Sequence, residues 1–119
     1  MADSLVGSAQ EQSRDNLLAF DHPHVILPIT VASGEGELAH GTVLGRLTAT
    51  GEYAAYTDGQ SDGSETARCV LHTPDKSIDA TSEAVKTYAI FHGGVRESEL
   101  TGIDAAGKVD LLAVNVWVV

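Results

Sequence analysis

Short apolar runs rich in Val, Ile, Thr and Leu alternate with turn-forming clusters along most of the chain. The clusters combine glycine with small or acidic residues, as in residues 33–36, 58–59, 62–63, 93–94 and 106–107. Glycine and aspartate favour turns because they adopt backbone conformations that most residues avoid. Apolar runs bounded by such clusters are typical of β-strands. The pattern therefore predicts strands over residues 29–32, 42–49, 52–57, 67–73, 85–92 and 110–119.

Strands at such short intervals leave little room for long helices, which indicates a mainly β domain with a barrel-like arrangement and short helical turns. One helical turn is expected near residues 97–100. The composition changes near residue 28, because residues 1–28 are rich in Ser, Gln, Asp and Asn and contain the breakers Pro23 and Pro28. A segment with so few apolar side chains buries too little surface to order itself in a core. We therefore predict a flexible N-terminal arm over residues 1–28 and a β-rich domain over residues 29–119.

The last predicted strand, residues 110–119, is apolar on both faces. One face carries Leu112, Val114, Val116 and Val118, and the other carries Leu111, Ala113, Asn115, Trp117 and Val119. A half-solvated edge strand normally has one polar face. Two explanations remain open: the strand is central in its sheet, or another subunit covers one of its faces. In the second case the possible subunit interface consists of Val114, Val116, Trp117 and Val118.

The chain has 119 residues, a length typical of one domain. It carries 17 acidic residues against 7 Lys plus Arg, a formal net charge of -10. This charge opposes binding to nucleic acid, which needs clustered cations, and to anionic membrane surfaces. No apolar run approaches the ~18 residues of a membrane span, and the N-terminus lacks the pattern of a signal peptide. We expect a soluble protein made in a reducing cytoplasm.

The candidate chemical groups do not form a recognisable site. Cys69 is the single cysteine, and its apolar neighbour favours a small buried side chain over a reactive thiol. Asp58, Asp62 and Glu65 lie in one polar loop, but their spacing differs from that of a calcium-binding EF-hand, so a solvated turn is the better interpretation.

Histidines and glycines give no stronger signal. His22 and His24 flank Pro23, yet two imidazoles without a third ligand make a poor zinc site. The glycines match neither a phosphate loop nor a dinucleotide fingerprint, and no nucleophile elbow is present. The sequence therefore predicts no catalytic residue, no metal site and no cofactor, and the protein is not expected to be an enzyme.

Several segments, at consistent separations, resemble one family. They are ITVASGEGEL at residues 29–38, GTVLGRLTATGEY at residues 41–53 and SDGSETARCVL at residues 61–71. Upstream, DNLLAFDHP at residues 15–23 is similar to the arm of many members. Together they look like the head decoration proteins of tailed bacteriophages, of the lambda protein D type.

This resemblance implies a β-tulip subunit that forms a homotrimer at three-fold sites on the outside of an expanded capsid. Such trimers stabilise the shell against the pressure of packaged DNA, and the partner of each arm is the major capsid protein. The arm would become ordered on binding and add a strand to a capsid sheet, which supplies main-chain hydrogen bonds. The residues expected to anchor it are Leu17, Leu18, Phe20, Pro23, Val25, Ile26 and Leu27. The alternative for these apolar side chains is packing against the protein's own body.

A second function remains open, a small β-barrel module that binds a ligand or carbohydrate on a virion or cell surface. Sugar-binding platforms usually need exposed aromatic faces, and only Tyr53, Tyr56, Tyr88 and Trp117 are available. A third, a small hydrolase, would require a pocket that brings a histidine, an acid and a serine together.

Overall fold

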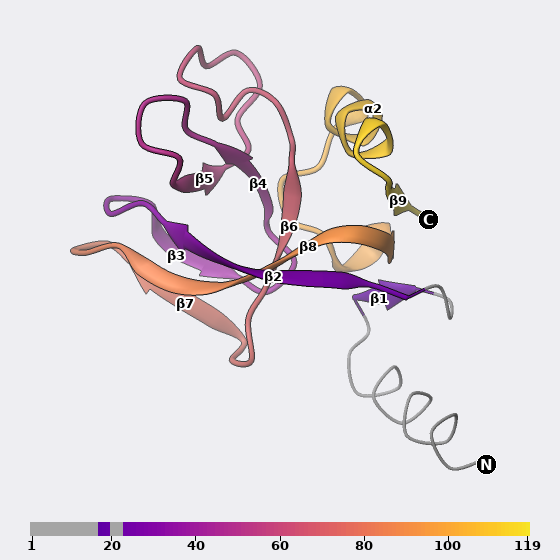
Figure 1. The fold of residues 1–119 in the computed structure, drawn as a ribbon, viewed down its shortest axis with the longest axis horizontal. Coiled ribbons are helices and arrows are strands. Elements are labelled where there is room, and N and C mark those ends of the chain that lie inside the picture. The colour runs from indigo at the N-terminus through magenta and orange to yellow at the C-terminus, as the bar shows by residue number, and fades with distance from the viewer. Residues whose placement is uncertain (1–16, 20–22) are drawn as a thin grey trace.

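A small closed barrel of 5 strands forms the centre of the computed structural model, which describes residues 17–19 and 23–119 (Figure 1). Around the barrel the strands follow the order β8, β2, β5, β4 and β6, and a pairing between β6 and β8 closes it. Their bounds are β2 Val25–Val31, β4 Val43–Arg46, β5 Tyr53–Ala55, β6 Cys69–His72 and β8 Val85–Val95. The prediction of a mainly β, barrel-like domain is confirmed.

Alternating side chains of the barrel strands divide the core into two clusters. Leu44, Leu71 and Ala89 point to one side, where they meet Ile29 and Val31. We call this group the barrel cluster. Cys69 belongs to it and is fully buried, and burial raises the pKa of its thiol, as expected for a small core side chain.

The opposite face of the same strands contributes to the second group, which we call the helix-side cluster. Val43, Val70 and Ile90 lie in it together with Leu111 and Val116 from the C-terminal elements. A strand that is covered on both faces has to be apolar at successive positions. The run at residues 69–71, of which no side chain is exposed, meets this requirement.

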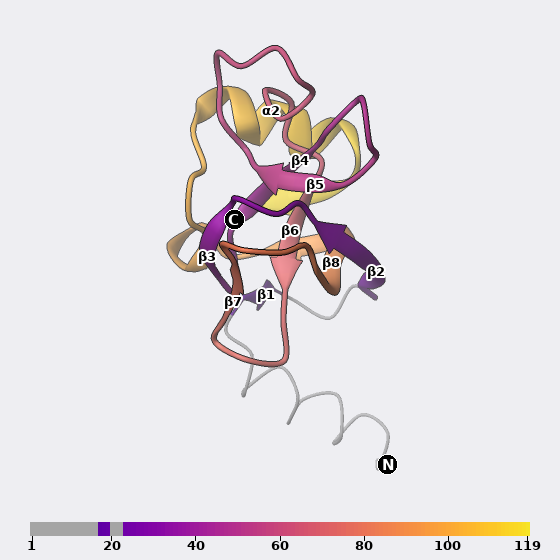
Figure 2. The same cartoon turned by 90° about the vertical axis from the view of Figure 1, so that its left-hand side faces the viewer.

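A separate two-stranded sheet consists of β3 (Gly36–Ala39) and β7 (Ser77–Ala80). It lies at one end of the barrel (Figures 1 and 2) and adds Leu38 and Ala80 to the barrel cluster. Each strand has four residues, of which only two carry apolar side chains, so the apolar pattern of the sequence does not indicate them.

The predicted strand over residues 110–119 is wrong. The chain there forms helix α2 (Ala105–Ala113), and only β9 (Val116–Val118) is extended. The Asp104 side chain accepts a hydrogen bond from the Gly107 backbone N–H at 2.7 Å, which caps the helix N-terminus. Asn115, with a φ of 66°, follows the helix end and turns the chain into β9. The apolar residues therefore follow a helical period, with Gly107 and Leu111 buried one turn apart.

The structure also contains most of the other predicted elements. The helical turn near residues 97–100 is confirmed as the short 3-10 helix η1 (Glu97–Glu99). Each of the first five predicted strands overlaps an observed one. The turn expected at residues 93–94 is wrong, because β8 continues through both glycines, and residues 106–107 belong to α2. The predicted domain boundary at residue 28 falls inside β2, which begins at Val25.

Candidate functional site

The N-terminal segment joins the body along the last residues of β8. The two-residue strand β1 (Leu18–Ala19) pairs antiparallel with β8, with Leu18 opposite Val95, while β9 pairs with the same stretch of β8 in parallel. Leu17 is only 1% exposed and lies in the helix-side cluster. The backbone N–H of Arg96 donates to the Leu17 carbonyl at 3.0 Å, and its guanidinium donates to the Leu18 carbonyl. From Leu17 onward, these backbone bonds attach the chain to the body.

His24 provides a second attachment between the segment and the end of β8. Its Nε2 lies 2.7 Å from the Gly94 carbonyl oxygen. Gly93 has a φ of 122°, and a Cβ at this position would lie 2.4 Å from Cδ2 of His24. The missing side chain at Gly93 therefore makes the room that the imidazole occupies. We call residues 17–19 together with Pro23 and His24 the arm root.

Beyond the arm root, the paired strands β2 and β8 expose apolar side chains on both faces. Val25 and Leu27 are 43% and 46% exposed, and Tyr88 is 47% exposed. Leu27 lies opposite Ala89 and the exposed Pro28 lies opposite Tyr88. Because adjacent residues of a strand point to opposite faces, Leu27 and Pro28 are exposed on opposite faces of this ribbon. Exposed apolar groups gathered in this way are typical of an interaction surface.

The structure distributes the predicted anchor residues over three environments. Pro23, Val25 and Leu27 are exposed, so they are accessible to a partner. Leu18 and Ile26 are half-buried against the helix-side cluster, in which Leu17 lies. Phe20 lies outside the described residues. The sequence pattern gave no sign that Tyr88 is exposed while the next residues of its strand are buried.

The residues predicted as a possible subunit interface lie mainly on the helix-side cluster. Val116 is fully buried in it, and Val114 and Val118 pack against it. The Trp117 ring is half-buried, with its centroid 5.3 Å from that of His92. The most exposed large apolar side chains of the C-terminal region are instead Val109, Leu112 and Val119. Their positions followed from the helix, which the sequence pattern did not predict.

The acidic loop uses its carboxylates to fix its own backbone. Asp62 accepts hydrogen bonds from the Ser64 hydroxyl at 2.6 Å and from the Ser64 N–H at 3.0 Å, which lowers the pKa of Asp62. Glu65 accepts from the Gly63 N–H at 2.8 Å. Among residues 17–19 and 23–119, no three His, Cys, Asp or Glu side chains are grouped so that they could hold a metal ion.

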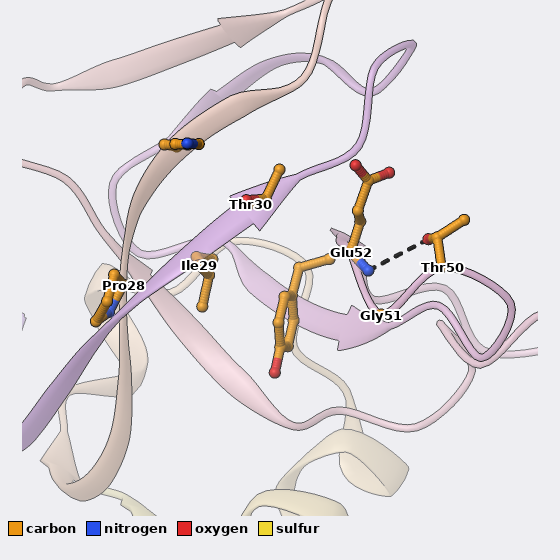
Figure 3. Close-up of a pocket in the computed structure, with 8 residues that line it drawn as sticks. Pro28, Ile29, Thr30, Thr50, Gly51 and Glu52 are labelled. Atoms are coloured by element: carbon orange, nitrogen blue, oxygen red, sulfur yellow. Dashed lines mark hydrogen bonds between the residues drawn. The ribbon is translucent and has the colours of Figure 1, made fainter.

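Two open hollows lie on either side of the loop that connects β4 to β5. One of about 390 Å³ lies between β2 and the start of β5, where the Glu52 N–H donates to the Thr50 hydroxyl oxygen (Figure 3). The other, about 290 Å³, has Arg46 and Arg68 among its lining residues. Neither hollow is lined by a histidine, so neither brings together the side chains of a hydrolytic triad.

The aromatic side chains do not form a shared platform. Tyr56 is buried and its hydroxyl donates to Asp104 at 2.8 Å, which, with burial, raises the pKa of Tyr56. Tyr53 packs edge-on against Phe91, with ring centroids 6.0 Å apart. Tyr88 differs from both, because it is exposed on the β2–β8 ribbon.

The sequence matches the family described as "Bacteriophage lambda head decoration protein D" over residues 6–115. The chain belongs to this family. Its members are structural components of the phage head, so the family places the protein on the virion capsid and implies binding to it. No curated protein matches the sequence. No helix within the described residues has the length and apolar character required to span a membrane.

Proposed function

We propose that this protein binds the outside of an expanded phage capsid as a homotrimer at three-fold sites and stabilises the shell against the pressure of packaged DNA. The family match, which covers nearly the whole chain, is the observation that carries this proposal. The protein acts by binding and not by catalysis. Its partners are the major capsid protein and further copies of itself. It is synthesised in the host cytoplasm before it joins the capsid.

The capsid contact is formed by the segment before Leu17 together with the arm root and the exposed β2–β8 ribbon. An extended segment that adds to a sheet edge gains main-chain hydrogen bonds, and alternate side chains fill pockets. Phe20, Pro23, Val25 and Leu27 supply apolar contacts in this proposal, while Leu17 holds the root on the body. The domain boundary that matters for binding then lies near residue 17 and not at residue 28.

Avidity compensates for the weakness of a single arm. Ordering a free segment costs on the order of 1–2 kcal/mol per residue in backbone entropy, which offsets much of the gain from its contacts. In a trimer, the first bound arm raises the effective concentration of the other two, and the overall affinity increases by orders of magnitude. Trimerisation therefore has a direct function in binding.

A deletion of residues 2–16 tests the arm mechanism. We expect this variant to keep its fold, because β1 and the Leu17 contacts remain, and to bind purified, expanded, undecorated capsids more weakly than the full-length protein. Binding is measured by co-sedimentation and folding by circular dichroism. A longer deletion through residue 28 would be a poor test, since it removes β1, Leu17 and the first part of β2, residues 25–28. Burial of one leucine contributes roughly 1.5–3 kcal/mol, so that variant would also be less stable.

The two parts of the proposal fail separately in this experiment. If the full-length protein shows no saturable binding to expanded capsids, the function is wrong. If the deletion variant binds as tightly as the full-length protein, the capsid-stabilising function stands and the arm mechanism is wrong.

A further inference from the structure

Helix α2 carries only two charged residues, and both are turned to the body of the protein. The Lys108 ammonium lies 2.7 Å from a carboxylate oxygen of Glu97. The Asp110 carboxylate accepts a hydrogen bond from the Ala67 backbone N–H at 3.0 Å. Both charges are therefore paired with groups outside the helix, and the Lys108 side chain remains 42% exposed.

The most exposed positions of α2 are all apolar. Val109 is 68% exposed and Leu112 is 59% exposed. The alanines at positions 105, 106 and 113 are exposed as well. We call Ala105, Ala106, Val109, Leu112 and Ala113 the α2 outer stripe. In the single chain only the side that bears Gly107 and Leu111 is covered, so the exposed apolar residues of α2 have no cover within the chain.

We infer that the α2 outer stripe is the surface through which copies of this chain contact one another. Each copy has a formal net charge of -10, so two copies repel unless they meet where carboxylates are absent. The stripe has no charged side chain, and its neighbour Lys108 is already neutralised by Glu97. A contact made here buries apolar area without placing like charges against each other.

The arrangement of the elements favours a second copy over the capsid as the occupant. In both views of the molecule, α2 lies above the barrel while β1 lies below it (Figures 1 and 2). This step rests on the proposed function, in which the arm root contacts the capsid. A capsid contact at the arm root leaves the exposed side of α2, which faces away from the cluster that Leu17 and Leu111 share, free for subunit contact.

The residue sizes in the stripe suit close helix packing. Leu112 and Val109 project between alanines, which allow a neighbouring helix to approach. Three copies of α2 around a three-fold axis would cover all three stripes in one central cluster. The subunit contact thereby moves from Val116 and its neighbours, which fill the chain's own core, to the outer side of the preceding helix.

The experiment compares two matched substitutions, Leu112→Gln and Leu27→Gln, by multi-angle light scattering at several protein concentrations. We expect the wild type to have a trimer mass and Leu112→Gln to fall to roughly one third of it, as for dissociation of a three-subunit ring. Leu27→Gln changes another exposed leucine, on β2, and should keep the trimer mass. A Leu112→Gln protein of wild-type mass, or a wild type that is monomeric at all concentrations, overturns the inference.

A crosslinking variant keeps the test valid if Leu112→Gln folds poorly. Cys69 is the single cysteine and is fully buried, so a cysteine introduced by Leu112→Cys is the accessible thiol. Mild oxidation should then produce a covalent dimer on a non-reducing gel, whereas Leu27→Cys should stay monomeric. An absence of dimer for Leu112→Cys counts against the inference.

Capsid binding is measured on the same samples to separate the two proposals. Self-association through α2 without any capsid binding would remove the proposed function and leave the interface standing. If the wild type binds capsids but shows no contact through α2, the proposed function stands and the interface is wrong.

Discussion

Gly93 shows how a single residue determines the geometry of the arm root. In the sequence it belongs to a glycine pair that indicates a turn, whereas in the structure it lies within β8 with a φ of 122°. The backbone conformation and the adjacent His24 ring both exclude a side chain there. The glycine is therefore required by a residue 69 positions earlier in the chain, which no local pattern reveals.

We expect Gly93→Ala to displace His24 and to weaken the attachment of the arm root. The strained backbone and the close contact should lower the free energy of unfolding by about 1–3 kcal/mol. Chemical denaturation measures this loss. Gly34→Ala is the matched control, because Gly34 also has a positive φ but has no atom near the position of an added Cβ. An equal loss for the two variants would show that backbone strain alone is responsible and that His24 contributes nothing.

At the scale of the element, α2 depends on its cap and on what packs beneath it. Asp104 accepts from the Gly107 N–H and from the Tyr56 hydroxyl, and these bonds lower the pKa of its carboxyl. Stability linked to a lowered carboxyl pKa is present above the unfolded-state pKa of aspartate and is lost as the pH falls through the lower folded-state value. The helix should therefore be weakened on acidification.

Two substitutions separate the cap from its charge. Asp104→Ala removes the acceptor and should lower the thermal midpoint at neutral pH, measured by circular dichroism. Asparagine caps helices as well as aspartate does, so Asp104→Asn should stay near the wild-type midpoint at neutral pH and lose less on acidification. Asp62 and Asp79 also have lowered pKa values and keep part of the acid dependence in every variant. If Asp104→Asn and the wild type lose stability identically between neutral and acidic pH, Asp104 is not part of the dependence.

The same element explains why the C-terminal prediction failed. An apolar run without polar alternation fits a buried strand, a buried helix or a covered surface, and periodicity cannot separate them. The deciding contacts are distant: Tyr56 and Ala67, far upstream, bind Asp104 and Asp110 at the start and middle of the helix. By contrast, the strands around residues 43–46 and 69–72 were found from the sequence, because glycine-rich turns bound their apolar runs.

At the scale of the whole molecule, the acidic balance sets how the protein approaches its partner. A net charge of -10 opposes non-specific association in solution and would direct the protein toward a basic capsid surface, if the capsid offers one. Long-range attraction of this kind is screened over a Debye length of about 8 Å at physiological salt. The dissociation rate, which reflects contacts at short range, depends far less on salt.

Stopped-flow mixing with expanded capsids tests this steering. We expect the association rate to fall steeply, by about tenfold or more, between low and physiological salt, while the dissociation rate changes little. An association rate that is independent of salt would show that charge does not guide the encounter, and it would leave the apolar contacts of the arm root and the ribbon as the source of binding.

The sequence by itself determined the mainly β class, most of the barrel strands, the buried cysteine and the family, because these depend on local turn chemistry, on short apolar runs and on ordered segments that can be compared directly. Only the tertiary structure decided where the N-terminal segment joins the body, that the C-terminal run is a helix, and that its outer side is an uncovered apolar stripe. The physical reason is that these features depend on which surfaces remain uncovered once distant parts of the chain have packed. A local pattern shows that a residue is apolar, but only the folded chain shows whether it is already in contact.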